Sequence, residues 1–121
     1  MTNALCQVSY DNQNKIIGSR IEVASSFWAR FRGLMGRKSL AEGEGLLLVP
    51  CSSIHCLGMK FAIDAIFLDK EYRVVDIHPN MKPGAIASHR NAHSILELKA
   101  GEADSHQVQI GERLKLEFMQ K

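Results

Sequence analysis

The chain lacks several features that would place it in a specialised class of protein. In 121 residues no apolar run approaches the roughly 20 residues that cross a bilayer, so we expect no membrane span and no membrane partner. The first residues contain no basic region and no uninterrupted apolar stretch, which argues against a secretory signal and predicts a cytoplasmic protein. Three cysteines, an odd number, favour reduced thiols over a disulfide framework and leave a Cys51–Cys56 bridge as the alternative.

The charge balance is too small to define a partner by itself. Lys and Arg number 15 against 13 Asp and Glu, a formal net charge of +2, so the long-range field does not predict a polyanionic ligand. Arg30, Arg32, Arg37 and Lys38 form a local cluster, but no nucleic-acid module signature accompanies it. We therefore interpret the cluster as a solvated face and expect no nucleic-acid partner.

What the sequence does contain is the composition of an ordinary globular protein. Hydrophobic residues make up 45% and charged residues 23%, and the length allows one core without disulfides or metal. We expect a single soluble domain over residues 1–121, present as a monomer.

Strand-like and helix-like periods alternate along the chain. The blocks "ALCQVSY" and "RIEV" flank the turn-forming "DNQN" and predict an opening hairpin. Over residues 26–35 the period becomes helical, and Phe27, Phe31, Leu34 and Met35 fall on one apolar stripe. We interpret this stripe as part of the core.

Five later segments have the pattern of strands: "GLLLVP", "IDAIFLD", "RVVDIH", "SILELKA" and "ERLKLEF". The first suits a strand buried on both faces. The last two should each have one wet face, with Glu97 outward in one and Leu114, Leu116 and Phe118 inward in the other. Because no helix is available for a parallel crossover, the predicted fold class is α+β: a β-rich single domain of mostly antiparallel strands curled toward a barrel, with one main helix near residues 26–35.

Three ordered blocks resemble an uncharacterised bacterial and archaeal family, domain of unknown function 192. They are "FRGLMGR", then "SIHCLGMKFAIDAIFLD" with "RVVDI", then "ILELKAGEA" with "IGERL", together spanning about residues 20 to 117. One subgroup carries a Cys-x-Ser-Ile-His segment leading to Met, a basic residue and Ile-Asp. The resemblance implies no biochemical activity, so the function is unknown, but it singles out Cys51, His55, Met59, Lys60 and Asp64.

The segment "PCSSIHCLGMKFAID", residues 50–64, brings together two thiols, an imidazole and a carboxylate, and several interpretations stay open. The plainest is a packed polar corner with an inert thiol. The second is a nucleophilic enzyme for acyl transfer or hydrolysis, in which His55 activates Cys51 and Asp64 orients the imidazole. In that interpretation Cys51 and His55 share one side of a helical turn.

A third interpretation is a metal site. Cys51, His55 and Cys56 could bind zinc, and the soft sulfur of Met59 could help to hold copper(I). Tetrahedral zinc needs four donors, or three and a water, and the sequence offers no regularly spaced fourth donor. We therefore expect no bound metal and no cofactor.

A fourth interpretation is a binding module. A pocket formed by Trp28, Met35, Met59 and the loop 80–93 would receive a small molecule or a peptide. Arg37 or Lys60 would anchor an anion there.

Asp64 needs partners in every one of these interpretations. It shares the face of an alternating strand with apolar residues, where an ionised group without partners costs several kcal/mol. We expect it to accept hydrogen bonds from backbone amides or from a cation, for which His55, Lys60 and Arg37 are the nearest candidates by motif.

Overall fold

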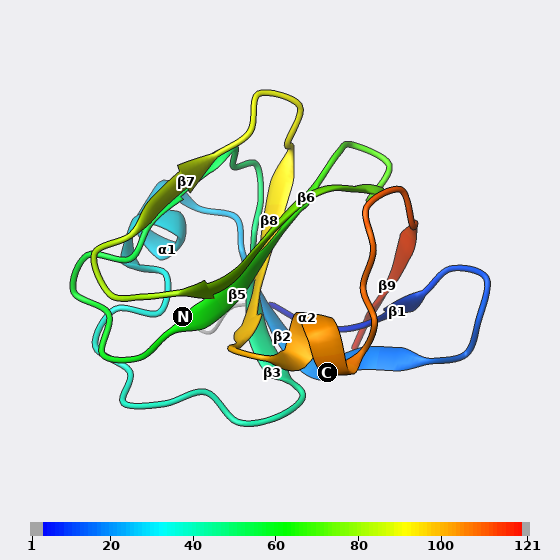
Figure 1. Cartoon of the computed structure of the whole chain (residues 1–121), viewed down its shortest axis with the longest axis horizontal. Coiled ribbons are helices and arrows are strands. Elements are labelled where there is room, and N and C mark those ends of the chain that lie inside the picture. Colours follow the sequence, from blue (N-terminus) through cyan, green and yellow to red (C-terminus); the bar gives the residue numbers. More distant parts are fainter. Residues whose placement is uncertain (1–3, 120–121) are drawn as a thin grey trace.

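The computed structural model describes residues 4–119 and shows one strongly curled sheet with a small second sheet beside it (Figure 1). The large sheet has seven strands in the order β6-β5-β8-β3-β2-β1-β9, and β4 pairs with β7 in the small one. The elements are β1 Ala4–Tyr10, β2 Ile16–Ala24, α1 Phe27–Arg32, β3 Glu44–Leu48, β4 Ser53–His55, β5 Ile63–Leu68, β6 Val74–Met81, β7 Ile86–Ser88, β8 Ser94–Lys99, α2 Glu102–Ser105 and β9 Leu114–Phe118.

The strand pairing confirms the predicted fold class, with one addition. β1 and β2 form the expected antiparallel hairpin, in which Cys6 lies opposite Ile21. β2 then pairs with β3 in parallel, placing Val23 opposite Leu47, and α1 lies in the crossover between them. The expectation that no helix serves a parallel crossover is therefore wrong. A parallel connection needs a dozen or more residues, which the segment between β2 and β3 provides.

The curl of the sheet brings its two edge strands, β6 and β9, together at one end. Arg73 and Arg113 form an isolated antiparallel bridge, and the Val74 amide donates to the Glu112 carbonyl at 2.8 Å. These contacts satisfy backbone groups that would otherwise be exposed at the sheet edges. We call the curled sheet the half-barrel.

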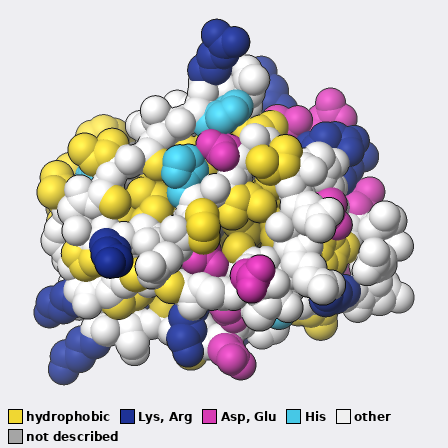
Figure 2. Space-filling view, in the orientation of Figure 1, with side chains coloured by type: hydrophobic (Ala, Val, Ile, Leu, Met, Phe, Trp, Pro, Cys, Tyr) yellow, Lys and Arg dark blue, Asp and Glu magenta, His cyan; other side chains and the backbone are white. Residues whose placement is uncertain are grey.

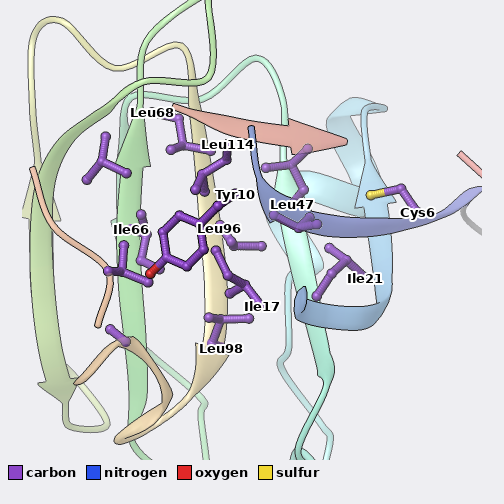
Figure 3. Packing of buried hydrophobic residues seen from close by; sticks show 14 of the residues in the cluster. Cys6, Tyr10, Ile17, Ile21, Leu47, Ile66, Leu68, Leu96, Leu98 and Leu114 are labelled. Carbon is purple, nitrogen blue, oxygen red and sulfur yellow. The ribbon is translucent and has the colours of Figure 1, made fainter. Parts of the chain in front are cut away.

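Each face of the half-barrel has its own hydrophobic core. The inner core contains Tyr10, Leu47 and Leu96 and fills the concave side (Figure 3). The outer core contains Phe67 and Ile95 and is covered by the small sheet and the segment after α1. Successive strand residues point to opposite faces, so the central strands contribute to both cores. As predicted for "GLLLVP", β3 is buried on both faces.

The predicted apolar stripe on the helix is mostly outside the core. Phe27 and Phe31 are 76% and 52% exposed, and only Leu34 of the stripe is fully buried. The reason is the length of α1, which ends before Gly33, whose φ of +50° turns the chain away. A helix of six residues cannot lay the whole stripe on the sheet. Neither helix among residues 4–119 is long and apolar enough to cross a membrane.

Two further burial predictions are wrong. Glu97 in β8 does not point into water, because the small sheet covers the face of the half-barrel that this side chain occupies. In β9, Leu114 is buried as expected, but Phe118 at the end of this edge strand is exposed.

Candidate functional site

A pocket of about 60 Å³ lies between α1 and the outer face of the half-barrel. Its size suits a head group of a few heavy atoms rather than a whole metabolite. Three parts of the chain line it: α1 with the segment that follows, the central strands β3 and β8, and residues 51–59. The lining residues that matter for its chemistry are Arg30, Phe31, Arg32, Met35, Cys51, His55, Met59 and Glu97.

The segment from Cys51 to His55 is extended in the structure. Ser53 pairs with Ser88 of β7, which fixes β4 as a strand. The Cys51 amide donates to the His93 carbonyl at 2.8 Å, and the Cys51 thiol donates to the Ser53 carbonyl at 3.1 Å. Cys51 and His55 therefore do not share a helical turn, because pairing with β7 draws the segment out straight.

Glu97 is the functional candidate that the sequence pattern missed. It lies on β8, between β3 and β5, and is only 5% exposed. Its Oε1 atom is buried and has no hydrogen-bond partner among the described residues. Burial raises the pKa of this carboxyl group to about 8, so it is largely protonated at neutral pH. The alternation in "SILELKA" is the pattern of a half-solvated strand, and nothing local marks its glutamate as buried.

The thiol of Cys51 is not activated. Burial raises its pKa, Glu97 raises it further once that carboxyl group ionises at higher pH, and the cation of Arg30 acts in the opposite direction. His55 is exposed, and its ring lies edge-on to Phe31 with the ring centroids 6.4 Å apart. No hydrogen bond between the His55 and Cys51 side chains is found in the described part of the chain, so no base is in place to take the thiol proton.

Thiol labelling checks this conclusion. We expect Cys51 to react slowly with a disulfide reagent such as dithiobisnitrobenzoate at pH 7, and faster as the pH rises, because the thiolate is the reacting form. A Cys51→Ser variant identifies its share of the signal, since Cys6 and Cys56 are buried. Rapid labelling of Cys51 below pH 7 would contradict an inert thiol.

Asp64 is held by backbone amides. Its Oδ1 accepts from Asn80 at 2.8 Å, and its Oδ2 accepts from Gly101 at 3.0 Å and Ala103 at 2.9 Å. The side chain is buried and joins β5 to the residues around α2 and the end of β6. The sequence predicts that either backbone amides or a cation bind this carboxylate, and the structure confirms the backbone amides.

The predicted combination of Cys51, His55 and Asp64 does not form. Asp64 lies on the same face of β5 as Ile66, which belongs to the inner core, and on the opposite face from Phe67, which belongs to the outer core. The Asp64 side chain therefore faces the inner core. Cys51 packs against the outer core, on the other face of the half-barrel. Spacing along the chain could not show this, because a strand sends neighbouring side chains to opposite faces.

The residues predicted to bind a ligand are spread over the pocket and its surroundings. Met59 is buried and lines the pocket. Trp28 does not line it, but stacks on Phe31 at the rim with ring centroids 5.9 Å apart, and is 66% exposed. Arg37 forms ion pairs with two acidic side chains at 3.7 and 3.9 Å, and Lys60 is exposed.

The donors considered for a metal are also separated. Within residues 4–119, no three His, Cys, Asp or Glu side chains are grouped as metal ligands would be. Cys51 and Cys56 are free thiols. His55, the last residue of β4, is exposed, whereas Cys56, which follows it, is buried.

Comparisons with known proteins match nearly the whole chain. The model of a family described as "Uncharacterized ACR, COG1430", domain of unknown function 192, matches residues 8–116. A UPF0127 protein of Pyrococcus horikoshii is 31% identical over 109 residues, which cover 87% of this chain and 94% of the relative. A UPF0127 protein of Thermococcus sibiricus is 29% identical over 110 residues, covering 87% and 71%. A crystal structure of a protein of unknown function from Novosphingobium aromaticivorans is similar in fold, with a TM-score of 0.78 at 21% identity over 92% of this chain and 83% of that one.

Proposed function

Because the chain belongs to the uncharacterised family domain of unknown function 192, which supplies no activity, we propose from its own geometry that it is a ligand-binding module. The pocket beside Glu97 receives the polar head group of a ligand, and the exposed rim around α1 holds the rest.

The Glu97 carboxyl group carries this proposal. A buried polar group without a hydrogen bond costs about 1 to 3 kcal/mol, and native proteins leave few such groups. A corner built only for packing would place an apolar side chain at this position of β8. Here the carboxyl group that contains the unpartnered Oε1 atom belongs to a residue lining a pocket, so a ligand that enters the pocket can hydrogen-bond to this carboxyl group.

Nucleophilic catalysis has less support from the same residues. The Cys51 thiol is protonated at neutral pH and already donates to a backbone carbonyl, and Asp64 is on the other face of the half-barrel. The arrangement therefore favours ligand binding over nucleophilic attack by the Cys51 thiol.

A titration with three small probes tests the proposal. We expect at least one of acetate, methylammonium and acetamide to shift the backbone NMR signals of Cys51, His55 and Glu97 in a saturable way. The shifts should change in a Glu97→Gln variant and stay the same in Glu117→Gln, which alters an exposed glutamate. If all three probes leave these signals unmoved, the pocket is a packed polar corner and the proposal fails.

A further inference from the structure

We propose that the head group bound in the pocket beside Glu97 is a carboxylate, and that the ligand carries it on an apolar body. This inference rests on the proposed function and names its ligand class. The support comes from the charges that line the pocket, from the hydrogen-bonding capacity of Glu97 and from the aromatic rim.

Two arginines line the pocket, and both are free of acidic partners among residues 4–119. Arg30 and Arg32 line it, and neither forms a salt bridge with an acidic side chain in the described part of the chain. Arg30 donates to the backbone carbonyls of Pro50 at 2.8 Å and Ser26 at 3.3 Å, which hold its guanidinium in place without neutralising it. An anion in the pocket would meet the Arg30 cation, which already acts on the Cys51 thiol of the pocket wall.

Glu97 adds a hydrogen-bond donor in place of a negative charge. The titratable groups around it are Cys51 and His55 of the pocket wall and the buried Cys56, together with the two arginines. With a pKa of about 8, its carboxyl group is an O–H donor at neutral pH. A carboxylate accepts from such a donor in a short, charge-assisted bond. An ammonium ligand could still donate to the carbonyl oxygen of the protonated carboxyl group, but it would find no negative charge there and would be repelled by the Arg30 cation.

The rim provides an apolar surface for the rest of the ligand. Trp28 stacks on Phe31, and Phe31 contacts the His55 ring, so the three rings are continuous from α1 to β4. Ile86 of β7 lies opposite His55 and is exposed. Figure 2 shows hydrophobic side chains gathered at the upper left, over α1 and β7 of Figure 1. At about 60 Å³ the pocket admits the carboxylate, and the body lies on this rim.

The same chemistry occurs in a free aryl or alkyl carboxylic acid and at the C-terminus of a polypeptide. Phenylacetate represents the first source and the tripeptide Gly-Gly-Phe the second, with its C-terminal amide as the uncharged form. Benzylammonium and phenylacetamide match phenylacetate in size and differ in head-group charge.

Calorimetric titration of the full chain in carboxylate-free buffer at pH 7 tests the inference. We expect phenylacetate to bind at least about tenfold more tightly than phenylacetamide or benzylammonium, since a hydrogen bond to a charged group is lost in both. Binding of Gly-Gly-Phe at least as tightly as phenylacetate, and loss of binding with its amide, would assign the site to polypeptide C-termini. Binding of phenylacetate alone would assign it to free acids.

The pH dependence identifies the role of Glu97. Above about pH 8 the affinity for phenylacetate should fall up to about tenfold per pH unit, because the donor proton is lost. In Glu97→Gln, whose amide keeps a donor, binding should persist without this fall. His55→Asn should still show the fall in affinity above about pH 8, which would exclude the His55 imidazole as its cause. Arg32→Gln, at an exposed side chain, should weaken binding about threefold at pH 7.

The outcomes separate the inference from the proposed function. Tighter binding of benzylammonium or phenylacetamide, or loss of phenylacetate binding in Glu97→Gln, overturns the carboxylate while leaving a binding pocket. Absence of binding by every probe, together with unmoved NMR signals, overturns both.

Discussion

Replacing Asp64 by alanine is expected to lower the free energy of unfolding by about 3 to 5 kcal/mol. The carboxylate accepts hydrogen bonds from the amides of Asn80, Gly101 and Ala103, and the substitution leaves these donors without their acceptor. One side chain thereby connects β5 to the end of β6 and to the start of α2. Urea unfolding followed by far-ultraviolet circular dichroism measures the loss.

Two further variants keep this prediction testable if the alanine variant does not fold. Asp64→Asn retains one carbonyl oxygen, so it can serve the donor to Oδ1 or the two donors to Oδ2 but not both sets, and its loss of stability should be intermediate. Asp104→Ala, at an exposed residue of α2, should change stability by less than about 0.5 kcal/mol. If Asp64→Ala lowers the free energy of unfolding by less than about 1 kcal/mol, the three backbone amides must be hydrogen-bonded to water in the variant.

Stability should also fall as the pH rises, and Glu97 should be the cause. Its pKa is raised from 4.5 to about 8 in the folded protein, so between these values the folded state holds a proton that the unfolded state has lost. The contribution of Glu97 is fully present below about pH 4.5, decreases as the pH rises through about 8, and is constant above it. The slope for one proton is about 1.4 kcal/mol per pH unit.

Comparison of the parent chain with Glu97→Gln isolates this contribution. Between pH 5 and 8 the free energy of unfolding of the parent should decrease relative to that of the variant, so that the difference between the two proteins shifts in favour of Glu97→Gln. Glu117→Gln alters a carboxylate that is more than half exposed and should follow the parent at every pH. Equal slopes for the parent and Glu97→Gln would mean that water reaches the carboxyl group and stabilises its charge.

The strands and their order of appearance could be predicted from the sequence because each has a local cause. The alternation in β5 and β9 and the turn residues between strands act over a few positions, and so does the Ser26 side chain, which accepts from the Ala29 amide and starts α1. Cys51, His55 and Met59 could likewise be identified as neighbours, because one short segment carries them. The parallel pairing of β2 with β3 depends on how a crossover folds back, which no short pattern encodes.

The two residues most misjudged from the sequence, Phe31 and Glu97, are misjudged for one reason. Each was assigned to a face by its period, and the period says which residues share a face but not what covers that face. The short length of α1 leaves Phe31 exposed, and the small sheet covers Glu97. The same missing information separates Asp64 from the thiol, because the choice of face is set by strands distant in sequence.

The position of Trp28 makes the fluorescence of the protein sensitive to what lies on the rim of the pocket. It is the only tryptophan in the chain, and it stands in contact with water beside the pocket instead of in either core. Its indole should therefore emit near the wavelength of a hydrated tryptophan in the folded state, and unfolding of the half-barrel should move that emission little. A ligand body or a partner surface laid on Phe31 would exclude water from the indole and shift its emission to the blue. Intrinsic fluorescence is thus a poor monitor of denaturation here and a direct monitor of occupancy.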